Sequence, residues 1–401
     1  MIKKIIHDKG ISLAATWSFN QLAYAIVYPF IPIYLCNMRN YEYSQVSIIF
    51  PLLGLAAIIA PVPFGYLTDR FGHSFMMLFG QAARGVIFFI LAFFVYIDAP
   101  FWVFALFLML NTAVGAAFQV GSDAYLFSIT TLNERPSYYS KIRMGFNVGW
   151  ALGPMMGAFF SKTPFWLFFI ITGLLCMAGT VYTKFVCCRT NTKQISAGPE
   201  TPKRETFNIR DIAENRHFLL LITGTFFLML TASQLYSTLS IFSTKTVGIS
   251  SKELGMIYSL NGFMVLLLQI PLVALAAKMK MTVVLQLFLG AILYTVGYLQ
   301  LGFAMNALFI AFCVAVITCG EIIIQPALYT AVSQQTKAEN AGRMFSLNSL
   351  MRGIGYAAGP WIGGQLFTHC NSIILWSVMA FFSIISMFFF YYGNIRAANA
   401  E

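Results

Sequence analysis

Long apolar runs, separated by short polar segments, follow one another along the whole chain. A helix that crosses the apolar core of a bilayer, about 30 Å thick, needs roughly 20 residues at a rise of 1.5 Å per residue. Division of the sequence at charged residues, Pro and Gly predicts spans at residues 11–36, 44–67, 74–97, 101–130, 140–161, 165–188, 217–241, 252–277, 280–303, 306–333, 343–367 and 371–393. The pattern therefore predicts an all-α integral membrane protein with twelve transmembrane helices.

A hydrophilic segment separates the sixth predicted span from the seventh. It concentrates charged residues such as Lys203, Arg204 and Glu205 around Gly198-Pro199. We therefore expect three parts, which are an N-terminal six-helix bundle at 1–188, a cytoplasmic linker at 189–216 and a C-terminal six-helix bundle at 217–401.

Two glycine-rich segments occupy the same ordinal place in the two halves. Small residues let helices approach closely, and a proline bends a helix. The fifth span carries Gly149, Gly153, Pro154 and Gly157, and the eleventh carries Gly355, Gly359, Pro360 and Gly363 in the same register. The shared order predicts a duplication, so the two bundles are expected to be pseudo-symmetric.

The composition supports a membrane location. Hydrophobic residues make up 59% of the chain and charged residues 10%, whereas soluble domains average about a quarter charged residues. The net charge of +11 is the excess of Lys and Arg expected on cytoplasmic loops rather than a sign of nucleic-acid binding. With the N-terminus inside, most of these residues fall in the cytoplasm, so both termini are predicted to be cytoplasmic.

The sequence lacks the residue patterns typical of disulfide, metal and nucleotide-binding sites. The seven cysteines have neither a paired extracellular pattern nor metal-ligand spacing, and the four histidines lie at predicted loops or termini. A phosphate-binding glycine loop is also missing from the sequence. We therefore expect no metal, no cofactor, no direct use of ATP and no enzymatic activity.

A short polar turn between the second and third spans carries the most distinctive motif. Its residues include Gly65, Asp69, Arg70, Gly72 and His73. Glycine supplies backbone freedom in such a turn. The pattern Gly-x-Leu-x-Asp-Arg-x-Gly resembles the cytoplasmic loop between the second and third helices of the major facilitator superfamily, and the Gly-Pro segment of the fifth span resembles that of the superfamily's antiporters.

The resemblance implies a transporter that works by alternating access. It implies that Asp69 faces the cytoplasmic start of the eleventh helix and latches the outward-open state. An acid near the cytoplasmic end of the fourth helix pairs with this loop in the superfamily. Asp123 resembles that acid, although Glu134 competes for the role, and the place of the usual second base is held by His73, which puts the contact with Asp123 in question.

Ionisable residues within predicted spans are candidates for function because burying them in a membrane is costly. Glu321 lies midway along the tenth span and is the leading candidate for a proton carrier or a partner of a cationic substrate, with Arg352 as an alternative fixed ion-pair partner. Asp123 and Arg84 form a second set, either a proton-coupling site or a fixed pair that holds the N-terminal half together.

Polar residues in the first span share one helical face, which predicts a cavity wall. These are Asn20, Gln21, Tyr24 and Tyr28. Matching polar positions in other spans are Asn111, Gln119, Gln234, Asn261, Gln325 and Asn348. Interhelical hydrogen bonding is the alternative role for each of them.

The leading functional hypothesis is proton-coupled efflux of a small organic compound by a monomeric secondary transporter in the plasma membrane, specifically the bacterial inner membrane. The alternative is proton-coupled or facilitated uptake of a metabolite or siderophore-like compound.

Overall fold

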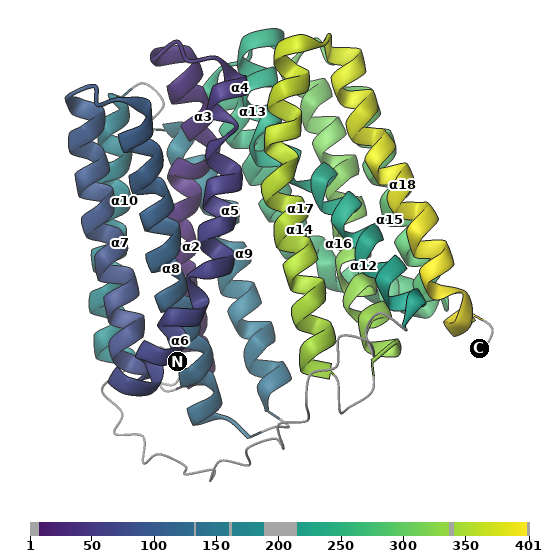
Figure 1. Ribbon diagram of the computed structural model, residues 1–401, viewed down its shortest axis with the longest axis horizontal. Coiled ribbons are helices and arrows are strands. Elements are labelled where there is room, and N and C mark those ends of the chain that lie inside the picture. The colour runs from purple at the N-terminus through teal and green to yellow at the C-terminus, as the bar shows by residue number, and fades with distance from the viewer. Residues whose placement is uncertain (1–7, 132–133, 160–162, 188–214, 337–340, 399–401) are drawn as a thin grey trace. The chain divides into compact units, whose positions relative to one another are not determined.

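The computed structural model describes residues 8–131, 134–159, 163–187, 215–336 and 341–398 (Figure 1). Every regular element in these ranges is a helix. The predicted linker at 189–216 lies outside the described residues, apart from Asn215 and Arg216.

Contacts divide the chain into two compact units. The first comprises Met1–Tyr34 and Leu55–Glu200, and the second comprises Leu35–Gly54 and Thr201–Glu401. The segment Leu35–Gly54 therefore packs with residues of the C-terminal half, where the Tyr43 hydroxyl lies 3.2 Å from Thr238 Oγ1. The bundle boundaries at 188 and 217 stay a prediction.

The helices follow the predicted spans closely. Those of the first half are α2 (Lys9–Val27), α3 (Ile31–Ile33), α4 (Tyr43–Val46), α5 (Ile49–Ile59), α6 (Pro61–Phe71), α7 (His73–Tyr96), α8 (Phe101–Ile129), α9 (Arg135–Phe159) and α10 (Phe165–Val186). Those of the second half are α12 (Arg216–Ala232), α13 (Thr238–Ile241), α14 (Ser251–Lys278), α15 (Val283–Leu301), α16 (Ala307–Gln334), α17 (Ala341–His369) and α18 (Ser372–Ala398).

Ten helical segments of the described chain are long and apolar enough to cross a membrane. The helices α9 and α17, with 25 and 29 residues, are not among them, and both contain the glycine-rich repeat. The all-α membrane fold is confirmed, while the count of twelve spans stays a prediction.

The first long helix of each half is interrupted in the same way. After α2 the chain forms a 3-10 turn at Tyr28–Phe30, the short α3 and a π-helical turn at Tyr34–Met38. After α12 it forms a 3-10 turn at Ser233–Tyr236, the short α13 and a π-helical turn at Phe242–Val247. This shared irregularity is what a duplicated unit would preserve.

The glycine repeat lies where two helices approach closely in each unit. In the first unit, a Cβ added to Gly149 would lie 2.6 Å from Gln21 Cβ, and one added to Gly153 would lie 2.5 Å from Ala25 Cβ. Gly157 similarly faces the carbonyl oxygen of Ile26. Glycines therefore hold α9 against α2, and Pro154 lies within the same stretch of α9.

The equivalent glycines of α17 face α12. A Cβ on Gly355 would lie 2.5 Å from the carbonyl oxygen of Phe226, and one on Gly359 would lie 2.5 Å from that of Leu230. The two segments that repeat in sequence thus occupy equivalent helix contacts in their own units.

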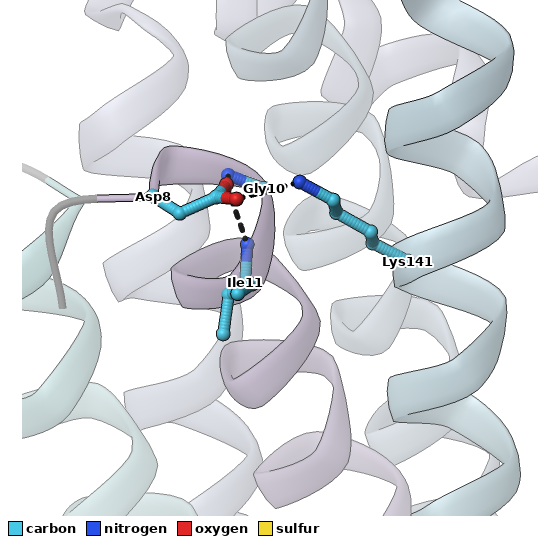
Figure 2. Close-up of polar contacts among 4 residues, drawn as sticks. All are labelled: Asp8, Gly10, Ile11 and Lys141. Carbon is cyan, nitrogen blue, oxygen red and sulfur yellow. Dashed lines mark hydrogen bonds and ion pairs between the residues drawn. The ribbon is translucent and has the colours of Figure 1, made fainter. Parts of the chain in front are cut away.

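A charged cap joins the start of α2 to α9 (Figure 2). Asp8 Oδ1 accepts hydrogen bonds from the backbone N–H groups of Gly10 and Ile11, at 2.8 and 3.2 Å. Asp8 Oδ2 lies 2.7 Å from Lys141 Nζ. The bond from Lys141 and the two backbone donors hold the pKa of Asp8 below its ordinary value.

Candidate functional site

A cavity of about 230 Å³ lies within the first unit. Four of the predicted cavity residues, Asn20, Gln21, Tyr24 and Gln119, contribute to its wall. The remaining wall residues are Trp17, Ala57, Arg84, Thr112, Gly115 and Ala116. The polar face of the first span therefore opens onto a cavity, and Arg84 is the one charged residue among those in its wall.

Arg84 is 5% exposed and is held by two amide groups. Its Nη1 donates to Asn20 Oδ1 at 2.5 Å and its Nε donates to Asn111 Oδ1 at 3.3 Å. The guanidinium carbon also lies 5.5 Å from the centre of the Tyr24 ring. Asn111 is itself 2% exposed, and its Nδ2 also donates to the Arg84 carbonyl oxygen at 3.3 Å.

The predicted pair of Arg84 with Asp123 is not formed. Asp123 follows Asn111, the Arg84 partner, by twelve residues on α8, which is about 18 Å along the helix axis. Arg84 lies halfway along α7, whereas Asp123 lies six residues before the end of α8. This correction separates the two residues into different sites.

Asp123 is half-buried on α8 and lies within electrostatic range of Tyr139 on α9. The sequence left open whether His73 contacts Asp123. The His73 imidazole packs on the Tyr125 ring, with 5.4 Å between ring centres, and its Nδ1 lies 3.1 Å from Ser74 Oγ. Glu134, the competing acid, accepts hydrogen bonds from the N–H and hydroxyl of Thr131 at 2.9 Å.

The polar turn is built around Gly72. This residue has φ 87° and ψ 152°, and it ends α6 and precedes α7. That backbone conformation is essentially restricted to glycine. Gly65 lies inside α6, while Asp69 and Arg70 are exposed near its end. The role of these residues as a latch stays a prediction.

Glu321 lies in a polar cluster of the second unit. Asn261 Nδ2 donates to Glu321 Oε2 at 3.3 Å and to Thr318 Oγ1 at 2.8 Å. Asn261 Oδ1 accepts from the Tyr236 hydroxyl at 2.6 Å. One asparagine therefore links the carboxyl group of α16 to α14 and to the irregular end of α12.

Arg352 of α17 contacts an amide of α16. Its Nη2 donates to Gln325 Oε1 at 2.8 Å, and its guanidinium carbon lies 5.4 Å from the centre of the Tyr329 ring. Gln325 follows Glu321 by one helical turn. Arg352 therefore contacts the residue one turn along α16 from Glu321 through an amide oxygen. The fixed ion pair of Arg352 with Glu321 stays a prediction.

Two predicted cavity residues are fully enclosed by protein. Gln234 and Asn348 are both 0% exposed. Gln234 lies in the 3-10 turn between α12 and α13, where its Nε2 donates to the Leu230 carbonyl oxygen and its Oε1 accepts from the Thr238 hydroxyl. Gly359 and Gly363 of α17 lie directly against the Gln234 amide. With no exposed surface, neither Gln234 nor Asn348 lines a cavity. Tyr28, 8% exposed, stacks on Tyr24.

Sequence reasoning missed the tyrosines that surround Glu321. Tyr294, Tyr298 and Tyr356 lie within electrostatic range of its carboxyl group. Nineteen tyrosines occur in the chain. Tyr294 and Tyr298 lie one turn apart on α15, whereas Tyr356 lies on α17, so no spacing within a single helix selects all three.

A family model described as the Major Facilitator Superfamily matches residues 13–360. The chain belongs to this superfamily. The MFS-type transporter YqjV of Bacillus subtilis (strain 168) is 24% identical over 396 residues, covering 96% of this chain and 93% of YqjV. Multidrug resistance protein MdtG of Escherichia coli O9:H4 (strain HS) is 23% identical over 363 residues, covering 86% of this chain and 84% of MdtG.

The fold is also that of solved superfamily structures. The nucleoside transporter NupG matches with a TM-score of 0.74 at 11% identity, over 96% of this chain and 98% of NupG. At this identity the likeness shows the fold alone. Relatives and structural neighbours are membrane transporters and not enzymes, so the chain is a multi-pass transporter of the superfamily.

Proposed function

We propose that this transporter exports a small organic compound in exchange for protons, by alternating access. The observation that carries the proposal is the Glu321 carboxyl group, held by Asn261 within membrane-spanning helices. Ionisable groups at such positions are costly and are typical of proton and ion pathways. Relatives named as multidrug resistance proteins favour export as the direction.

The same proposal places the protein in the bacterial inner membrane as a monomer, with both termini in the cytoplasm. The distribution of Lys and Arg supports this orientation, because positive residues concentrate on cytoplasmic loops. Asp123 is the second candidate for proton coupling. Its half-buried place on α8 keeps it separate from the Arg84 cavity.

The test uses membrane vesicles of both orientations under an imposed proton gradient. A compound that stabilises the purified protein is selected first, since a bound ligand raises apparent stability by mass action. Export predicts that a gradient with an acidic interior drives loading of inverted vesicles. If right-side-out vesicles load when their exterior is acidic, and vesicles with an acidic interior do not, the result would instead support proton-coupled uptake.

Glu321→Gln should abolish gradient-driven loading while the protein still folds, because glutamine keeps the shape and cannot release a proton. Asp123→Asn tests the second candidate under the same conditions. Glu42→Gln is the matched control, since Glu42 is an exposed carboxylate just before α4. Unchanged gradient-driven loading in Glu321→Gln would show that another group couples the proton.

A further inference from the structure

The buried cation of the first unit has no role in the proton coupling proposed above. Transferring an ion from water into a protein costs several kcal/mol unless it is paired. The Arg84 guanidinium nevertheless lies in a cavity wall, where its two hydrogen-bond partners are neutral amide oxygens. A cation held in this way favours an anion as its further partner.

No carboxylate of the first unit supplies that partner within the described residues. Asp8 binds Lys141, Glu134 binds Thr131, and Asp123 lies about 18 Å along α8 from Asn111. Asp98 follows Arg84 by fourteen residues, or about 21 Å along α7 and the turn after it. Asp69 is exposed near the end of α6.

The guanidinium keeps donors available toward the cavity. Arginine has five N–H donors, and Asn20 and Asn111 occupy two of them. Its planar fork suits two oxygens of a carboxylate or phosphate at once. The amides of Gln21 and Gln119 stand in the same wall, without hydrogen-bond partners among the described residues, and could bind further polar atoms of a ligand.

The rest of the wall suits the organic part of such a ligand. Trp17 is fixed by a bond from its Nε1 to Ser122 Oγ at 2.7 Å, and Tyr24 stacks on Tyr28 with 4.7 Å between ring centres. Gly115 leaves space next to Arg84, since a Cβ there would lie 3.5 Å from Arg84 Cδ. The cavity thus combines one cation, free amides and rigid aromatic faces.

We propose that this cavity binds the oxyanion group of a small organic anion through Arg84, so that the substrate of the transporter is an organic acid. This inference rests on the proposed function for its link to transport. The binding itself stands on the geometry of the first unit alone.

The test compares matched ligands on the purified full-length protein. Sets of aromatic and aliphatic carboxylic acids and phosphate monoesters are each measured against the neutral amide or alcohol and the amine of the same skeleton, by thermal stabilisation. The acids should stabilise the protein and their counterparts should not. Equal stabilisation by amides or amines, or none by any acid, would overturn the proposal.

Variants then assign the effect to Arg84. Arg84→Gln should weaken acid binding by about 10- to 100-fold, the range expected for loss of a charged hydrogen-bond donor. Arg84→Lys should recover part of it. Arg143→Gln is the control, because Arg143 is an exposed arginine of the same unit. Acid binding that survives Arg84→Gln unchanged would also overturn the proposal.

Gly115→Val covers the case in which Arg84→Gln does not fold. It keeps the charge and fills the space beside the guanidinium, so acid affinity should fall. Acid binding without proton-driven flux would contradict the proposed function and leave this inference standing. Proton-driven flux confined to neutral or cationic compounds would support the proposed function and contradict the inference that the substrate is an organic acid.

Discussion

At the scale of single residues, the turn between α6 and α7 depends on one backbone conformation. Gly72 adopts φ 87° and ψ 152°, a region costly for residues with a Cβ by about 1–3 kcal/mol. Gly72→Ala should therefore lower the free energy of unfolding by roughly that amount, measured as a lower unfolding temperature or faster irreversible unfolding of the purified protein.

Gly65→Ala is the matched control for this change. Gly65 lies within α6, and a Cβ there would meet no atom within 4 Å. Alanine is the better helix former by about 1 kcal/mol, so this variant should be as stable as the parent or more so. Equal losses in both variants would show that the turn does not depend on its positive φ.

At the scale of helices, the junction of α2 with α9 should depend on pH. The pKa of Asp8 is held below its ordinary value of 3.8, first by Lys141 and then by the two backbone donors. A depressed pKa means that the stabilisation is present above about pH 4 and is lost as pH falls through the folded-state pKa.

Lys141→Met should lower stability near neutral pH by no more than about 1 kcal/mol, because both side chains are about one-third exposed and solvent screens the pair. The difference from the parent should shrink as the pH is lowered below about 4. Thermal unfolding of both proteins across this range measures it, with Lys278→Met as an exposed-lysine control. A stability difference between Lys141→Met and the parent that is constant with pH would show that the Asp8–Lys141 ion pair does not cause it.

The helices themselves were largely predictable from the sequence. The span expected at 252–277 is α14, Ser251–Lys278, because apolar runs end at charges and turn residues on both sides. The span expected at 140–161 begins earlier, at Arg135, since the polar residues before Lys141 continue the helix beyond the apolar run. Hydropathy locates the membrane segment of a helix and not its polar extension.

The candidate site was predictable only where one helix determines it. The polar face of α2 was visible as a spacing of three and four residues, and it does line the cavity. The hydrogen-bond partners of Arg84 and Arg352 were not predictable, because they depend on which helices pack together and on how far along each helix the residues lie. Arg84 therefore binds Asn20 and Asn111 instead of Asp123.

At the scale of the whole molecule, the two proposals assign different tasks to the two units. The first unit would bind the anionic group of the substrate at Arg84, and the second would carry the proton at Glu321. Ligand binding and proton coupling should then be separable by mutation. Arg84→Gln should weaken acid binding by about 10- to 100-fold, whereas Glu321→Gln should keep the parent's acid affinity and lose gradient-driven flux.

The orientation of the chain in the membrane gives the last prediction. Lys252 and Lys278 are exposed residues at opposite ends of α14, about 39 Å apart along the helix axis. With the termini in the cytoplasm, the Lys252 end of α14 faces outward. A membrane-impermeant maleimide should therefore label Lys252→Cys in intact cells and Lys278→Cys only after permeabilisation. Labelling of the parent protein gives the background from its own seven cysteines. The opposite pattern would place the termini outside, and with them Lys141 and the loop at Gly72.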